Sequence, residues 1–284
     1  MSDPLDARRV LVTGGSGGIG RAVCLALAKR GARVVVAGRR RDAIAETLAA
    51  LGGGGHRGLQ LDVGDAEAWP RALAELDADG ALHGLVTAAA ELEPIGPLGS
   101  YEPSAFWRTV RVNLYGTLLA LHHCLPRLSR ASGAAVTFSG GGATGPLPRY
   151  DAYAASKAAV VRLSENVAAV AEQMGVPVNC VAPGFVPTGM HEATLAAGPE
   201  RAGEDYYDLT RRTLEEGGAS PERAAELVCF LLGPEARRIR GKLISAQWDP
   251  WEEPEFRRRL ETEPDLATLR RIDGSAFVPA PARA

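Results

Sequence analysis

Short apolar runs alternate along the chain with longer stretches in which apolar residues recur every three or four positions. The short runs lie at 10–13, 33–37, 59–63, 82–87, 134–139, 178–181 and 243–247. The longer, helix-like stretches lie at 19–30, 43–51, 66–76, around 106–128, at 151–174 and at 221–232. Continuous β-branched runs separated by helices are typical of parallel strands covered on both faces. The pattern therefore predicts an α/β protein with a doubly wound parallel sheet of about seven strands, which binds ligands at the carboxyl ends of its strands.

Two segments depart from this alternation. Residues 189–218 are polar and rich in acids, and we expect them to form a helical insertion that acts as a substrate lid. Residues 249–284 extend beyond the last predicted strand and contain a helix-like stretch at 256–271. Their last few residues, rich in proline and alanine, are expected to be loose. The whole chain is expected to be a single domain with its core at 8–248.

Charge and cysteine usage exclude several classes of protein. The formal net charge of −2 offers no basic face for nucleic acid. No segment is apolar and long enough for a membrane span, so we expect a cytoplasmic protein. The four cysteines are scattered through apolar stretches without metal-ligand spacing, so we expect buried residues and no metal site.

A glycine-rich turn, Thr-Gly-Gly-Ser-Gly-Gly-Ile-Gly, follows the first predicted strand and opens the first helix. Glycines allow the backbone to approach a pyrophosphate, and the helix N-terminus offers free N–H groups and a positive dipole end. The turn therefore predicts a dinucleotide site, although a tight turn without a ligand would have the same composition. The contacts expected here are Gly14, Ser16, Gly17, Gly18, Ile19 and Gly20.

The end of the second strand indicates which dinucleotide binds. An acidic residue there would accept hydrogen bonds from the adenosine ribose, but the chain continues Gly38-Arg39-Arg40. Gly38 leaves room, and the guanidinium groups of Arg39 and Arg40 can pair with a 2′-phosphate. We therefore expect NADP(H) rather than NAD(H), the alternative being a solvated helix start. Asp62 and Val63, after the third strand, lie where a side chain could meet the adenine.

Tyr153 and Lys157 lie four residues apart on a predicted helix and so share one face. A nearby cation stabilises a phenolate and brings the phenol toward a useful range for acid–base catalysis. Such a pair alone is common on protein surfaces. Here it follows a strand that ends in Ser139-Gly140 and comes after a glycine turn, which indicates a proton-transfer site.

These residues together resemble the short-chain dehydrogenase/reductase family over about residues 8–247. The resemblance rests on the sequences TGGSGGIG, VNLYG, YAASK and the Pro-Gly that follows VNCVA. It implies a Rossmann-type fold and a homodimer or homotetramer joined through the helices that carry Asn113 and Tyr153. In the family the tyrosine moves the hydroxyl proton, which assigns that role to Tyr153.

The resemblance also assigns the residues around the tyrosine. Lys157 would lower the phenol pKa and hold the nicotinamide ribose, and Asn113 would anchor a water molecule that links Lys157 to solvent. The turn after the sixth strand would position the nicotinamide through Pro183, Gly184, Val186 and Thr188.

Two departures from the family pattern matter. The family's Asn-Asn-Ala-Gly is Thr-Ala-Ala-Ala at 87–90, where the small Ala88 and Ala89 still allow close approach to the cofactor. The family's substrate-orienting serine would fall on Gly140. Ser139 either takes over this catalytic role, with the loop bending through its glycines, or only caps the end of the strand.

The sequence predicts an NADP(H)-dependent oxidoreductase that acts on a secondary alcohol or ketone of a small polar substrate. A redox-neutral epimerase or a non-catalytic NADP-binding sensor would use many of the same residues. Substrate contacts are expected from Glu91, Gly141, Tyr206 and Trp248, with Tyr207 or Trp251 as further candidate ring faces.

The acids of 189–218 and 249–255 favour an amine-bearing substrate, such as an amino sugar or aminocyclitol of bacterial specialised metabolism. Their alternative is a set of solvated helix faces.

Overall fold

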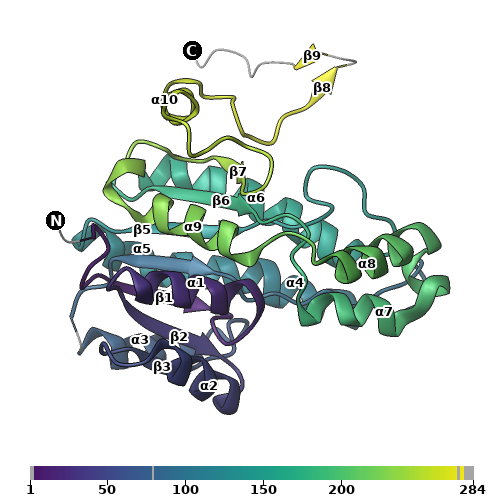
Figure 1. Ribbon diagram of the computed structural model, residues 1–284, viewed down its shortest axis with the longest axis horizontal. Helices are drawn as coiled ribbons and strands as arrows, with labels where there is room; N and C mark the ends of the chain where they lie inside the picture. Colours follow the sequence, from purple (N-terminus) through teal and green to yellow (C-terminus); the bar gives the residue numbers. More distant parts are fainter. Residues whose placement is uncertain (1–2, 79, 274–275, 278–284) are drawn as a thin grey trace.

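The computed structural model describes residues 3–78, 80–273 and 276–277. Seven parallel strands form one sheet in the order β3-β2-β1-β4-β5-β6-β7, as predicted (Figure 1). Their bounds are β1 Arg9–Thr13, β2 Arg33–Gly38, β3 Arg57–Gln60, β4 Gly84–Thr87, β5 Ala134–Phe138, β6 Val178–Ala182 and β7 Leu243–Ser245. The strand order reverses between β1 and β4, which in this fold places a ligand crevice at the carboxyl ends of the strands.

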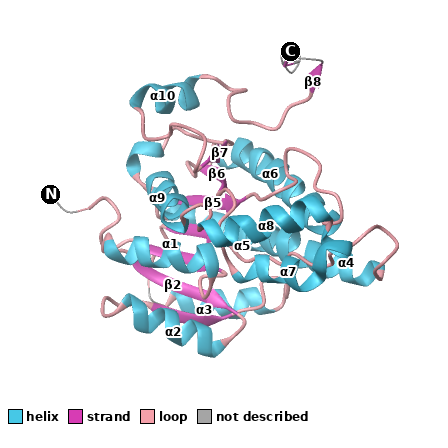
Figure 2. Cartoon of the chain, turned by 45° about the vertical axis from the view of Figure 1, so that its right-hand side comes forward, coloured by secondary structure: helices cyan, strands magenta, loops and turns pink. Residues whose placement is uncertain are grey.

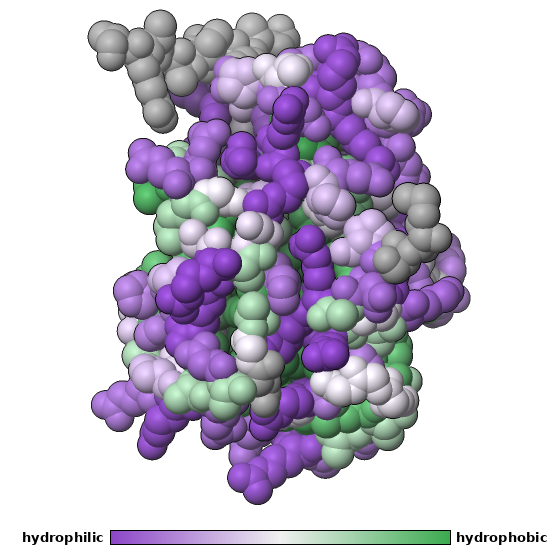
Figure 3. All heavy atoms as spheres, turned by 90° about the vertical axis from the view of Figure 1, so that its left-hand side faces the viewer, coloured by the Kyte–Doolittle hydropathy of each residue, from purple (hydrophilic) through white to green (hydrophobic). Residues whose placement is uncertain are grey.

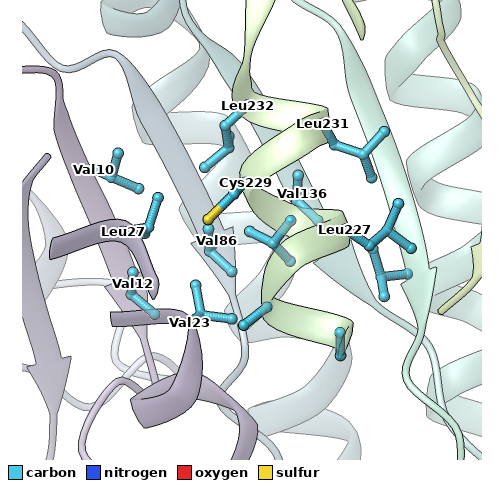
Figure 4. Packing of buried hydrophobic residues seen from close by; sticks show 14 of the residues in the cluster. Val10, Val12, Val23, Leu27, Val86, Val136, Leu227, Cys229, Leu231 and Leu232 are labelled. Carbon is cyan, nitrogen blue, oxygen red and sulfur yellow. The ribbon is translucent and has the colours of Figure 1, made fainter. Parts of the chain in front are cut away.

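The strands are apolar throughout because both faces of the sheet are covered. Along β1, Val10 and Val12 enter one core while Leu11 enters the other. Helices α1 (Gly18–Lys29) and α9 (Pro221–Leu232) cover the first core, where Val23, Leu27 and Leu227 meet the strand valines (Figure 4).

Helices α3 (Ala68–Asp77), α5 (Gly116–Arg130) and α6 (Asp151–Ala171) contribute residues to the second core. Helix α2 (Arg41–Leu51) packs beside β2 and β3. The doubly wound arrangement expected from the sequence is confirmed.

The long helical stretch around 106–128 is three consecutive pieces. Helix α4 (Pro103–Val110) passes into a π-helical turn, η1 (Arg111–Tyr115), and then into α5. The extra backbone residue of a π turn changes the direction of the side chains around it. Asn113 lies in this turn and is buried. The predicted site residue Asn113 thus occupies the irregular part of an otherwise regular helix.

The predicted insertion is helical, with α7 (Gly189–Ala202) and α8 (Glu204–Glu216) packed against each other beyond the end of the sheet (Figure 1). Both views place α7 and α8 at the same end of the molecule as α4 (Figures 1 and 2). The surface opposite this lid is largely hydrophilic, with narrow apolar patches (Figure 3). No helix of the described chain is both long and apolar enough to span a bilayer.

The C-terminal extension differs in part from its prediction. Helix α10 (Pro254–Thr262) stops well before 271, so the prediction of one helix over 256–271 is wrong. Pro264 disfavours helical geometry at Glu263, and Lys242 Nζ binds the carbonyl oxygens of Glu263, Pro264 and Leu266 at 2.6–3.0 Å. Two short strands follow, β8 (Ile272–Asp273) and β9 (Ala276–Phe277). The loose tail expected at the end lies outside the described residues.

Candidate active site

A cavity of about 1260 Å³ lies at the carboxyl ends of the strands, where the fold predicts a ligand. The loops after all seven strands contribute to its walls, together with residues of α7 and α8. The predicted residues that line it are Gly14, Ser16, Gly17, Gly18, Ile19, Gly38, Arg39, Arg40, Asp62, Val63, Ala88, Ala89, Glu91, Ser139, Gly141, Tyr153, Lys157, Pro183, Gly184, Val186, Thr188, Tyr206 and Trp248. Gly20 and Asn113 lie behind the wall and shape it.

The glycine turn forms a cradle that fits a dinucleotide. Gly14 has φ of +65°, and a Cβ there would lie 2.6 Å from the Ala89 nitrogen. Gly20 packs directly on the Gly14 carbonyl group, so a side chain would not fit. A Cβ at Gly17 would instead meet nothing within 4 Å. Helix α1 begins here without a side-chain cap or an acid in its first turn, so its N-terminal N–H groups and dipole can bind a pyrophosphate.

The end of β2 supplies charge to the same groove. A Cβ at Gly38 would lie 2.7 Å from Ser16 Oγ, which explains the glycine. Arg39 Nη1 lies 2.8 Å from Glu91 Oε1, and Arg40 is exposed at the cavity. A 2′-phosphate would therefore meet two guanidinium groups, one of which already has a carboxylate partner.

Tyr153 and Lys157 lie on α6, as predicted. Lys157 Nζ is buried, donates to the Phe138 carbonyl oxygen at 3.0 Å and lies 5.7 Å from the centre of the Tyr153 ring. Burial, and secondarily the Tyr206 phenol, raises the pKa of Tyr153, while burial lowers the pKa of Lys157 to about 8. This differs from the lowered phenol pKa that the sequence indicates, because burial disfavours the charged phenolate.

Asn113 holds the loop after β4 against the catalytic helix. Its side chain accepts from Glu91 N at 2.8 Å, donates to Glu91 O at 2.9 Å and donates to Ser156 Oγ at 2.9 Å. Ser156 Oγ in turn donates to the Tyr153 carbonyl oxygen at 2.7 Å. The Asn113 carbonyl oxygen accepts from Thr117 Oγ1 at 2.7 Å. The asparagine therefore links the two sides of the site, and its role as a water anchor stays a prediction.

Comparison with known proteins agrees with this geometry. The family model for short chain dehydrogenases matches residues 8–197. The chain belongs to the short-chain dehydrogenase family. The pig protein dehydrogenase/reductase SDR family member 4 is 30% identical over 245 residues, which cover 85% of this chain and 86% of the relative. Cis-4-hydroxycyclohexanecarboxylate dehydrogenase of Sinomonas cyclohexanicum is 33% identical, with 86% and 97% covered.

A solved structure supports the same assignment. A short-chain type dehydrogenase/reductase from Mycobacterium ulcerans superposes with a TM-score of 0.75 at 29% identity, covering 85% of this chain and 88% of that chain. The predicted family and Rossmann-type fold are confirmed, and the protein is an NAD(P)-dependent oxidoreductase.

The position of the family's serine is closed to any side chain in this dehydrogenase. A Cβ at Gly140 would overlap the Tyr153 hydroxyl group. Ser139 is 4% exposed and lines the cavity, and its side chain makes no hydrogen bond within the described residues. The Ser139 backbone nitrogen donates to the Val181 carbonyl oxygen at 2.9 Å and so continues the hydrogen-bond ladder between β5 and β6. The Ser139 hydroxyl is thus available to a ligand.

The substrate side of the cavity corrects one expectation about this dehydrogenase. We expected the lid acids to line the mouth, but none does, and all are exposed on the outer faces of α7 and α8. These acids are Glu192, Glu200, Glu204, Asp205, Asp208, Glu215 and Glu216. The apolar residues of an amphipathic helix face its packed side, so the charges point outward. Of the candidate ring faces, Tyr207 and Trp251 do not line the cavity, and Trp251 is buried against Phe230.

The inner wall is apolar and aromatic instead. Its lining includes Leu92, Leu147, Phe185, Met190, Ala193 and Tyr206. Several of these pack with the Tyr153 ring in one cluster. His191 stacks on Phe185 with ring centres 4.0 Å apart, and burial lowers its pKa, so it is neutral near pH 7. The sequence analysis did not predict this wall. Met190, Ala193 and Ala197 are three and four residues apart, however, and this spacing is typical of the inward face of a helix.

The four cysteines are buried, as the sequence predicts. Cys24, Cys124, Cys180 and Cys229 are all free and buried, and burial raises the pKa of each thiol. No group of three His, Cys, Asp or Glu side chains in the described ranges could hold a metal ion.

Proposed function

We propose that this dehydrogenase transfers a hydride between NADP(H) and a secondary alcohol or ketone, with Tyr153 moving the hydroxyl proton. The observation that carries the proposal is the Tyr153 phenol, which faces the cavity between the glycine cradle and the apolar wall. The dinucleotide supplies or accepts the hydride. In the direction of reduction, Tyr153 gives its proton to the carbonyl oxygen and must therefore be protonated at working pH. Its raised pKa satisfies that requirement.

Ser139 is proposed to orient the reacting oxygen in place of the serine that Gly140 replaces. Ser139 lines the same cavity as Tyr153, and its side chain makes no hydrogen bond within the described residues. Lys157, fixed by the Phe138 carbonyl, would hold a ribose hydroxyl of the cofactor and return the proton to Tyr153.

Because Tyr153 is the proposed proton donor, Tyr153→Phe should reduce turnover about 100-fold or more while leaving cofactor binding nearly unchanged. Turnover near that of the wild type would exclude Tyr153 as the proton donor.

NADP(H) is the proposed cofactor. Gly38, Arg39 and Arg40 support a 2′-phosphate and offer no acid to a 2′-hydroxyl group. Charge-assisted contacts contribute about 1.5–3 kcal/mol, which is roughly tenfold or more in affinity. Fluorescence titration of NADPH and NADH measures the difference, and equal affinities would contradict the preference.

A ring-bearing, uncharged alcohol or ketone is the substrate class that the cavity wall supports best. Leu92, Leu147, Met190 and Tyr206 would bury apolar surface of such a ring beside the phenol. The relative named cis-4-hydroxycyclohexanecarboxylate dehydrogenase has a ring alcohol in its name, which supports the ring; the carboxylate in the same name does not support the absence of charge.

An amino sugar or aminocyclitol is the second candidate substrate. Asp249 supports it, because this half-buried carboxylate lines the cavity beside the exposed Trp248. The ammonium group would, however, share the cavity with the buried Lys157, which raises the cost of burying it.

A substrate panel separates these candidates. Cyclohexanone derivatives, with and without an amino group, and neutral sugars are compared by nicotinamide absorbance. Highest kcat/KM for the unsubstituted ring supports the apolar wall, and highest kcat/KM for the amine supports Asp249. A product of inverted configuration without net change in the cofactor would instead identify the epimerase.

A homodimer or homotetramer is also proposed, through the helices that carry Asn113 and Tyr153. Exposed apolar side chains on the segment from α4 through η1 to α5, which carries Asn113, support it. Trp107 is 65% exposed, and Tyr115 and Leu118 are each 40% exposed. Light scattering of the purified enzyme measures the mass, and a monomer would contradict the proposal.

A further inference from the structure

Arg39 and Glu91 form an ion pair across the dinucleotide groove. Arg39 directly follows β2, and Glu91 lies in the loop after β4. Strand β1 lies between these two strands in the sheet, and the glycine turn follows β1. The bond of 2.8 Å between Arg39 Nη1 and Glu91 Oε1 therefore joins the two banks of the groove in front of the turn.

The Glu91 side of this pair is fixed. Both backbone polar atoms of Glu91 bind the buried side chain of Asn113, at 2.8 and 2.9 Å. Asn113 is itself held to α6 through Ser156. The Glu91 side chain is only 22% exposed and lines the cavity. Its carboxylate is thus presented at one bank of the groove from a backbone that has little freedom to move.

The Arg39 side is free to exchange partners. Its side chain is 62% exposed, and Glu91 is its one ion-pair partner within the described chain. A guanidinium group pairs with a carboxylate or with a phosphate through the same N–H donors. The single guanidinium group of Arg39 would therefore have to bind both Glu91 and an incoming 2′-phosphate.

We propose that Glu91 competes with the 2′-phosphate of NADP(H) for Arg39 and so sets the affinity of the groove for that cofactor. Glu91 is then a specificity-determining residue of the cofactor site, acting through Arg39. This inference rests on the proposed NADP(H) preference. An unphosphorylated adenosine ribose does not compete for the guanidinium group, so the effect of Glu91 is specific to the phosphorylated nucleotide.

Glu91→Gln tests the competition with fragments that carry no nicotinamide. Isothermal titration calorimetry compares 2′,5′-ADP with 5′-AMP on the wild type and the variant. We expect the variant to bind 2′,5′-ADP about two- to fivefold more tightly, the range that partly exposed ion pairs give. The affinity of the variant for 5′-AMP should stay within about 1.5-fold of the wild-type value, because the ribose of 5′-AMP carries no 2′-phosphate that could bind Arg39.

A double-mutant cycle separates competition from a general effect of charge. In the Arg39→Ala background, Glu91→Gln should no longer improve 2′,5′-ADP binding. Glu93→Gln is the matched control, because Glu93 is exposed, also lines the cavity and has no ion pair within the described chain. It should leave both affinities unchanged. Thermal unfolding of each variant confirms that the groove is intact.

The outcomes distinguish this inference from the proposed cofactor. Equal gains for both fragments, or a gain that persists without Arg39, would overturn the competition. If Arg39→Ala leaves 2′,5′-ADP binding unchanged, the NADP(H) preference itself fails. If Arg39→Ala weakens that binding while Glu91→Gln does nothing, the preference stands and only the role of Glu91 is refuted.

Discussion

The cofactor groove and the substrate wall are two sides of one cavity, but different parts of the chain form them. Backbone forms much of the groove, because Gly14, Gly17 and Gly18 bring the chain close to the ligand space. Side chains form the wall, where Leu92, Met190 and Tyr206 pack around the phenol. A backbone-built site needs glycine at fixed positions and so leaves a pattern in the sequence. A wall of side chains depends on which way each helix faces.

The largest expected effect distinguishes two glycines of the groove. Gly14→Ala places a Cβ against the Ala88–Ala89 backbone at positive φ, and should lower the free energy of unfolding by about 3 kcal/mol or more. Gly17→Ala should leave stability nearly unchanged, because its Cβ meets no protein atom within 4 Å. It should instead weaken NADPH binding, since the methyl group enters the ligand space. Chemical denaturation measures the stability of each variant, and NADPH titration measures its affinity for the cofactor. Equal stability of the two variants would refute the distinction.

Lys157 lies where the groove meets the wall, and its ammonium is buried with one carbonyl partner. Burial lowers its pKa to about 8 from 10.5, so between these values the unfolded chain holds more protons than the folded one. Stability from this group is therefore lowest below about pH 8 and rises with pH, by up to about 3 kcal/mol.

Lys157→Met lacks this titration and is the test of the buried charge. The variant should exceed the wild type in stability near pH 7, and the two should converge toward pH 10. Cysteine and tyrosine titrations act in the opposite direction, but both proteins share them, so the difference between the two unfolding curves isolates Lys157. A difference that is independent of pH would show that the ammonium is solvated in the folded protein.

The sequence predicted the sheet well because parallel strands buried on both faces leave continuous apolar runs. Its errors have local causes. The third strand was placed at 59–63, but pairing with Val35–Gly38 of β2 sets it at Arg57–Gln60 and leaves Asp62 and Val63 at the cavity. The π turn at Asn113 has no apolar signature, and the end of α10 depends on the distant Lys242.

The placement of the proposed catalytic residues divides in the same way. The common face of Tyr153 and Lys157 could be predicted, because it follows from a spacing of four residues on a helix. The outcome at Gly140 could not, because it depends on where a hydroxyl group of α6 ends in space. The direction of the lid acids was equally hidden, since composition alone does not distinguish the two faces of α7 and α8.

A smaller effect tests the exchange of roles between Ser139 and Gly140. Ser139→Ala should lower turnover about tenfold through the loss of one hydrogen bond to the reacting oxygen. Gly140→Ser restores the family's residue, yet it should also lower turnover, because its Cβ displaces the Tyr153 hydroxyl group. Steady-state kinetics and NADPH binding measure both. Full activity of Ser139→Ala would show that Ser139 does not orient the reacting oxygen, and a gain from Gly140→Ser would show that position 140 can still hold an orienting serine.

The smallest effect is expected on the outer face of the lid. Glu204→Gln and Asp208→Asn remove exposed charges that lie outside the cavity lining, and each should change KM by less than about twofold. Met190→Ala is the matched change on the inner face. Losing its apolar contacts should raise KM for a ring substrate about fivefold or more.

Ionic strength provides an independent readout, because a mouth that attracts cations through its acids would show a KM that rises with added salt. A KM that is insensitive to salt and to both acid variants, but sensitive to Met190→Ala, assigns substrate selection to the apolar wall. The reverse pattern would return it to the charged face.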